Sequence, residues 1–139
     1  MQGRKPVVVD TNIFFSALLR TESSMGEVLL RCEEHFFICE MVIVELFKHK
    51  EKIVRLSQLS QEDIVRFYYA LIKYTDIFKE QLIAPENWTK AYNLCRSIDE
   101  TDTPHVALTL ELKGLLWTGD RHLKDGLKRK GFDKFFETK

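Results

Sequence analysis

Three short apolar runs without polar alternation constrain the fold of this chain most strongly. They occupy Val7–Val9, Phe36–Cys39 and residues 115–118. A strand with one face in water alternates polar and apolar residues, so an unbroken apolar run predicts a strand that is buried on both faces. Helical patterns separate the three runs. The sequence therefore predicts βαβ units and an α/β fold with a parallel sheet covered on both sides.

The segments between these runs carry helix signals. Spacing and start signals predict helices over residues 12–19, 24–34 and 41–56, and further helices that begin near Ser60, Pro85, Pro104 and Arg121. The second of these rests on the capping-box spacing of Ser24 and Glu27. Gly114 is expected to end the helix that begins near Pro104. Phe135 and Phe136 are expected to form a closing strand.

Length and composition indicate one domain over residues 1–139. Hydrophobic residues make up 45% and charged residues 30%, which excludes a disordered or fibrous chain. The three cysteines, Cys32, Cys39 and Cys95, form no Cys-x-x-Cys pair, so we expect neither disulfides nor a thiolate zinc site, and a reducing, cytoplasmic location. The first apolar run is too short for a signal peptide, and no stretch has the length of a membrane span.

The net charge of zero is the sum of unlike parts. Residues 1–20 carry three bases against one acid, residues 21–112 carry ten bases against sixteen acids, and residues 113–139 carry eight bases against four acids. A zero balance by itself argues against a nucleic-acid partner, which basic proteins favour. The two basic ends nevertheless permit such a partner, depending on where the fold places them.

Two acids stand where strands are predicted to end. Asp10 follows the first apolar run, and Asp120 follows the run at 115–118. Ligands of parallel sheets bind beyond the carboxyl ends of the strands, so neighbouring strands would bring these carboxylates to one edge. The alternative for each residue is a helix N-cap, which Asp favours.

Three more acids are candidates for the same edge. Glu45 stands in an otherwise apolar helical stretch, where an acid is costly unless it is paired or binds a metal. A surface pair with Lys48 or His49 is the alternative. Asp102 precedes the helix start at Pro104, where the helix dipole favours an anion, and Asp99 lies in the same acidic loop.

Several carboxylates at one edge, without matching bases, raise one another's pKa. A hard divalent cation such as Mg²⁺ resolves this repulsion, because it takes oxygen ligands and bridges to phosphate oxygens. Such a site can orient or deprotonate a water molecule and stabilise charge on a phosphodiester.

Other enzymes with a similar fold fit the sequence less well. A haloacid-dehalogenase-like phosphatase requires a second Asp two residues after the first, and this position is Asn12. A receiver-like domain would have paired acids at the end of its first strand, where only Asp10 stands. The glycine-rich motifs of P-loop and dinucleotide-binding proteins are missing from the sequence. A non-catalytic binding module with a decayed site stays open, although the acids that a metal site needs are present.

Three segments together resemble the PIN-domain ribonucleases, a family that includes the VapC-like toxins of prokaryotic toxin–antitoxin pairs. The segments read VVVDTNIFFSALL, VIVELFK and IDETDTPHVALTLELKGLLWTGDRHL, in the family's order. The resemblance covers essentially the whole chain. It implies a three-layer α/β/α sandwich around a parallel sheet, for which we expect about four to five strands.

The resemblance also implies a site and a reaction. The reaction is hydrolysis of RNA phosphodiester bonds by a water molecule that Mg²⁺ or Mn²⁺ activates. By motif position the acidic cluster is Asp10, Glu45, Asp102 and Asp120, with Asp99 as an additional or substitute acid. Asn12 and Thr118 correspond to its polar supporting residues. A homodimer and an antitoxin partner are implied in the same way.

Three residues beside the acids have open roles. Arg121 and Lys124 follow Asp120 and either contact RNA phosphates or form a solvated helix start. His105 lies three residues after Asp102, on a similar helix face. We expect His105 in the core or in solvent rather than at a metal.

Overall fold

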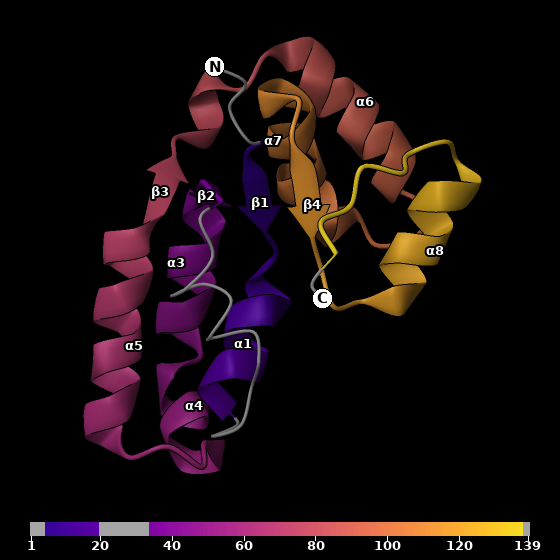
Figure 1. Ribbon diagram of the computed structural model, residues 1–139. Coiled ribbons are helices and arrows are strands. Elements are labelled where there is room, and N and C mark those ends of the chain that lie inside the picture. The colour runs from indigo at the N-terminus through magenta and orange to yellow at the C-terminus, as the bar shows by residue number, and fades with distance from the viewer. Residues whose placement is uncertain (1–4, 20–33, 138–139) are drawn as a thin grey trace.

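The computed structural model describes residues 5–19 and 34–137. Its centre is a four-stranded parallel sheet in the order β3-β2-β1-β4 (Figure 1). The strands are β1 (Val7–Val9), β2 (Phe36–Cys39), β3 (Thr75–Phe78) and β4 (Leu115–Trp117). All three predicted apolar runs are strands, and the predicted α/β class is confirmed.

Helices occupy most of the other described residues. They are α1 (Thr11–Leu19), α3 (Glu40–Lys48), α4 (Lys50–Leu56), α5 (Gln61–Tyr74), α6 (Pro85–Cys95), α7 (Thr103–Leu112) and α8 (Arg121–Arg129). Two short 3-10 helices, η1 (Glu80–Leu82) and η2 (Glu100–Asp102), precede α6 and α7. Residues 24–33 of the helix predicted at 24–34, Cys32 among them, lie outside the described residues. Within those residues, no helix combines the length and apolarity needed to cross a bilayer.

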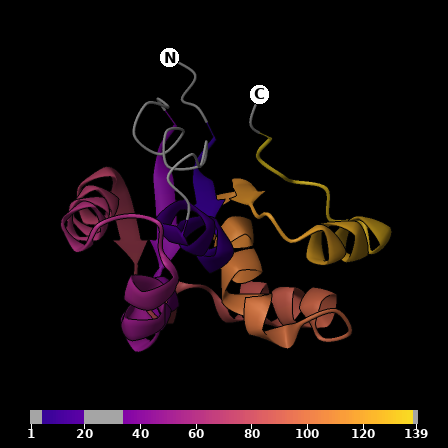
Figure 2. The ribbon, with the colours of Figure 1, turned by 90° about the horizontal axis from the view of Figure 1, so that it is seen from below.

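Two hydrophobic cores, one on each face of the sheet, explain why the strands lack alternation. Successive strand residues point to opposite faces. Val7 and Val9 pack into a core with α1, α3, α4 and α5, whereas Val8 packs into a second core with α6, α7 and α8. Helices α6 and α7 lie side by side in that second layer (Figure 2). The chain thus forms the predicted three layers, and all three valines are fully buried.

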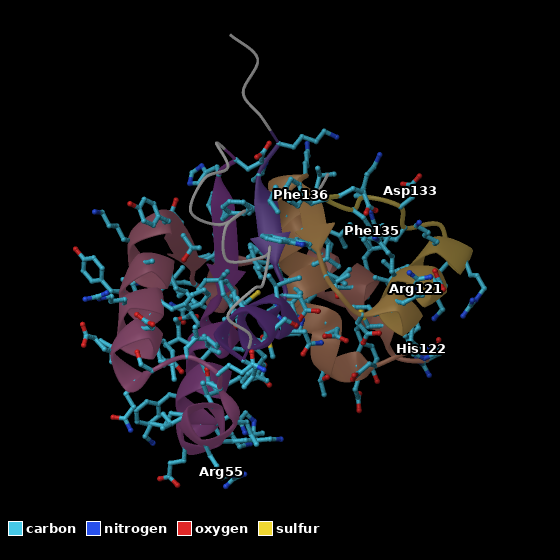
Figure 3. All side chains as sticks on the ribbon, turned by 60° about the horizontal axis from the view of Figure 1, so that its bottom comes forward. Arg55, Arg121, His122, Asp133, Phe135 and Phe136 are labelled. Atoms are coloured by element: carbon cyan, nitrogen blue, oxygen red, sulfur yellow. The ribbon has the colours of Figure 1, made fainter. Side chains whose placement is uncertain are left out.

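The fourth strand is not the one that the sequence suggested. It is β3, an edge strand that follows α5 directly and pairs with β2. Its middle residues are exposed, and Asp76 is of a type depleted in strands, so the segment lacks the apolar run of a buried strand. Phe135 forms only an isolated bridge with Leu116, and the Phe136 ring packs 5.3 Å from the Trp117 ring beside β4 (Figure 3).

The single helix predicted over 41–56 is two helices, α3 and α4, with a break at His49. Neither Pro nor Gly causes the break. Instead, the end of α4 is tied to the end of α1, because the Ser57 hydroxyl donates to the Leu18 carbonyl and the Gln58 N–H donates to the Leu19 carbonyl. Ile53 is thereby buried in the first core. Tertiary contacts therefore decide where this helix bends.

The end of α7 also differs from its prediction. The left-handed residue is Lys113, with φ of 54°, and not Gly114. Gly114 is required for another reason, since a Cβ built on it would lie 2.2 Å from the Pro6 carbonyl oxygen. This close approach lets the Leu115 N–H donate to that oxygen at 2.8 Å and starts the pairing of β4 with β1.

Substitutions at these two neighbours should therefore have opposite effects. Gly114→Ala should lower the free energy of unfolding by about 1–3 kcal/mol, because the added methyl group overlaps backbone. Lys113→Gly should raise it by about 1 kcal/mol, because glycine adopts positive φ without steric cost. Urea denaturation of both variants measures the difference. Equal effects, or a larger loss for Lys113→Gly, would contradict this account of the turn.

Candidate functional site

A cavity of about 130 Å³ lies at the carboxyl ends of β1 and β4. All four acids predicted from the sequence line it, and so does the acid named as their alternative. Its acidic lining residues are Asp10, Glu45, Asp99, Asp102 and Asp120. Residues separated by up to 110 positions in the sequence thus meet in one place, because strand ends and helix starts bring four of them to the same edge of the sheet. Glu45 reaches this edge from within α3.

Asp10 is held by the strand beside it. Its backbone N–H donates to the Trp117 carbonyl at 3.0 Å, which extends the pairing of β1 with β4 past the end of β1. The Thr118 hydroxyl donates to Asp10 Oδ2 at 2.7 Å and accepts from the Asp120 N–H at 3.1 Å. Thr118 therefore links two of the acids, and Asp10 is buried with a fixed carboxylate.

Asp102 is the acid whose ionisation the site disturbs most. It ends η2 and is buried, at 9% exposure, directly before α7. Burial is the largest cause that raises its pKa from the ordinary value of 3.8 to about 7, and the negative charges of Asp10, Asp99, Asp120 and Glu45 contribute to the same rise. The geometry thus concentrates negative charge around Asp102.

Two of the acids also cap helices, a role predicted from the sequence as the alternative for Asp120 but not for Asp99. Asp120 Oδ1 accepts from the Leu123 N–H at 3.1 Å and caps α8. Asp99 Oδ1 accepts from the N–H and the hydroxyl of Thr101, at 3.0 and 2.6 Å, and caps η2. Each cap uses one carboxylate oxygen and leaves the other oxygen available, so capping and a place in the cavity are compatible.

Glu45 reaches the cavity from the middle of α3. The Thr11 hydroxyl donates to Glu45 Oε1 at 3.2 Å. Within the described part of the chain, Glu45 forms an ion pair with neither Lys48 nor His49, and the His49 ring instead packs against Phe15. Glu45 is thus oriented toward the other acids rather than along its own helix.

His105 is the site residue that the sequence argument placed incompletely. It is buried, as one alternative proposed, but it also lies at the acids: its Nε2 is 3.4 Å from Asp10 Oδ1 and 3.4 Å from Thr11 Oγ1. The His105 ring thus lies within reach of both Asp10 and Thr11, and through Thr11 it adjoins Glu45. The signal in the sequence was the three-residue spacing from Asp102.

Two further predictions concern residues at the rim. Asn12 is exposed and lines the acidic cavity. Its backbone N–H, rather than its side chain, donates to Asp10 Oδ1 at 3.4 Å. Arg121 lies on the first turn of α8 (Figure 3). With Lys124 it lines a neighbouring cavity of about 490 Å³ that shares Asp120 with the acidic one. Lys124 Nζ pairs there with Glu137 at 2.8 Å.

The donor set fits a hard divalent cation. One ligand atom from each of Asp10, Asp102 and His105 lies within 4.8 Å of the others, and Glu45 and Asp120 line the same cavity. Carboxylate oxygens are the ligands that Mg²⁺ and Mn²⁺ prefer. A cation would also offset the repulsion that raises the pKa of Asp102.

Comparisons with known proteins agree with this architecture. The sequence profile of a family described as PIN domain matches residues 8–137. Among solved structures, a crystal structure of PAE2754 from Pyrobaculum aerophilum has a similar fold, with a TM-score of 0.60. It is 15% identical in sequence, and the match covers 91% of this chain and 83% of that chain. A search of curated proteins gives no match.

Asp102 should make the stability of the metal-free protein depend on pH. Its folded pKa is raised above the unfolded value, so the folded protein favours the protonated carboxyl group. The contribution of this protonated group to the free energy of unfolding is fully present below about pH 4 and is lost as the pH rises through about 7. Asp102→Asn should therefore be more stable than wild type at about pH 8, by about 2 kcal/mol, and lose this advantage at about pH 4. Denaturation in EDTA at both pH values measures the effect. A variant that is less stable at the higher pH would contradict the raised pKa.

Metal affinity should depend on the buried carboxylate of Asp10. Asp10→Asn should weaken Mn²⁺ binding at least tenfold in calorimetric titrations, because it removes a charged oxygen ligand at the centre of the cluster. Asp133→Asn is the matched control, since Asp133 is an exposed acid that does not line the cavity. Equal affinities for the two variants would exclude the assigned site.

Proposed function

The chain belongs to the PIN-domain family, and on this premise we propose that it is an endoribonuclease that hydrolyses RNA phosphodiester bonds with Mg²⁺ or Mn²⁺. PIN domains are generally metal-dependent nucleases. The observation that carries the proposal is the convergence of Asp10, Glu45, Asp102 and Asp120 on one cavity. Their charges have no basic partner there other than His105, among the residues that the structure describes.

The metal ion would be held by this cluster. We assign Asp10 and Asp102 as its most direct ligands, because they are the two buried acids, and Glu45 and Asp120 as ligands that act directly or through water. When bound, the ion supplies activation of a water molecule and stabilisation of negative charge on the phosphodiester. Asp99 is exposed and caps η2, so we assign it as an additional acid of the cluster rather than as a replacement for Asp102.

The surrounding residues keep the carboxylates in place. The Thr118 hydroxyl donates to Asp10 and orients its carboxylate. The chain of contacts from His105 through Thr11 fixes Glu45. These groups are positioned before substrate arrives, so little reorganisation accompanies binding.

The basic residues on α8 support an RNA substrate. Arg121 and Lys124 line the cavity that adjoins Asp120, and we propose that they contact phosphates beside the scissile bond. Bound metal ion would also reduce the negative potential of the acids toward a phosphate. The zero net charge of the chain is therefore compatible with an anionic substrate.

We further propose a cytoplasmic homodimer. Phe47 and Ile72 expose more than 60% of their surface and line an apolar groove between α3 and α5, and exposed apolar surface of this kind marks protein interfaces. Cys39 and Cys95 are buried free thiols, which suits a reducing compartment. A toxin role with an antitoxin partner rests on family membership, and it predicts growth arrest on expression that a neighbouring gene relieves.

RNA cleavage tests the proposal directly. Purified protein with Mn²⁺ should cleave single-stranded RNA, and Asp102→Asn should reduce the rate at least about 100-fold, because the site loses a buried charged ligand. Asp133→Asn should cleave like wild type. Cleavage assays on a fluorescent oligonucleotide measure all three proteins in parallel.

Equal cleavage by wild type and Asp102→Asn would overturn this assignment of the site. The double variant Asp99→Asn, Asp102→Asn then separates two causes: loss of activity would assign the role to Asp99, and unchanged activity would indicate a contaminating nuclease.

A further inference from the structure

A second cavity, of about 300 Å³, opens directly beside the acidic one. The two cavities share Asn12 and Phe15, which stand on the first turns of α1 immediately after Asp10. A substrate bound at the acids therefore has continuous access to this second space. Neither the family's acidic cluster nor the basic cavity on α8 accounts for it.

The walls of this cavity are apolar and aromatic. Ile53 is fully buried beneath it, and Leu19 and Leu56 complete the apolar part of its lining. The Phe15 ring is half-buried and lies edge to face with the His49 ring, at 5.8 Å and 64°. Packing thus fixes an aromatic ring at the boundary between the two cavities.

Polar groups stand at the rim of the same cavity. Asn12 is exposed, and its side-chain amide offers both donors and an acceptor. Lys52, exposed on α4, adds a positive charge to this lining and does not line the acidic cavity. By contrast, the lining of the cavity on α8 is mostly charged and contains no aromatic residue among those described.

We propose that this second cavity binds a nucleobase next to the scissile phosphate, and that it determines which RNA sequences are cleaved. The inference rests on the proposed ribonuclease function. A nucleobase has apolar faces and a polar edge, which match the Phe15 ring and apolar wall on one hand and the Asn12 amide on the other. Lys52 is placed to contact the next phosphate. A base can enter only when it is unstacked, so the substrate is single-stranded RNA.

Binding of short RNAs tests this cavity without depending on cleavage. The probes are fluorescent phosphorothioate hexanucleotides of A, C, G or U, and a hexamer of the same backbone without bases, each with Mg²⁺. Wild type should bind at least one base-bearing hexamer about tenfold more tightly than the baseless one, since stacking on an aromatic ring stabilises each bound base. Phe15→Leu, which keeps apolar volume but removes the ring, should lose this preference.

Two pairs of variants make the result specific to the cavity. Tyr69→Leu is the control for Phe15→Leu, because Tyr69 is an exposed ring that lines neither cavity. Leu56→Trp should fill the cavity and also abolish the preference, whereas Val54→Trp, an exposed residue of the same helix outside the cavity, should not. Thermal melting confirms that each variant is folded, and the half-exposed Leu56 gives a test that does not alter the core.

The outcomes separate this inference from the function on which it rests. Equal binding of base-bearing and baseless hexamers by wild type, or an equal preference in Leu56→Trp and Val54→Trp, would overturn the nucleobase site. If unmodified RNA is cleaved while either result holds, the ribonuclease function stands and only the base site fails. Base-dependent binding through Phe15 without any cleavage supports the base site and overturns the catalytic proposal.

Discussion

Repulsion between carboxylates at the carboxyl end of β1 is the constraint on which the rest of this structure depends. Asp10 and Asp102 are both buried there, and the charges of neighbouring acids add to the cost of ionising Asp102. A fold can hold such a cluster only if other interactions offset its cost. Here two hydrophobic cores, one on each face of a fully buried strand, supply that stabilisation.

The backbone rather than the side chains sets the geometry of the acids. Asp10 and Thr118 each follow the last residue of a strand, and the pairing of β1 with β4 leaves them in hydrogen-bonding distance. Asp120 and Asp99 are fixed as caps of α8 and η2. Because these acids are tied to element boundaries, the acidic site is preformed, and it adjoins a basic cavity at Asp120 and an aromatic cavity at Phe15.

Local signals predicted much of this arrangement. The unbroken apolar runs identified β1, β2 and β4, and the N-cap at Ser60 identified the start of α5. They could not identify β3, because an edge strand with exposed residues has no buried pattern to reveal it. They also missed the break at His49, since the contacts of Ser57 and Gln58 with the end of α1 come from residues far apart in the sequence.

For the site, the sequence by itself determined which acids are present. Most of them stand at strand ends and helix starts, in an order typical of PIN domains. Their identity and spacing are local properties, and a parallel sheet collects strand ends at one edge by its topology alone. Only the tertiary structure decided that Glu45 turns toward Thr11, that buried His105 lies beside Asp10, and that Phe15 stands between two cavities. Those features depend on how helices pack across the sheet, and side-chain contacts between distant segments have no signature in the order of residues.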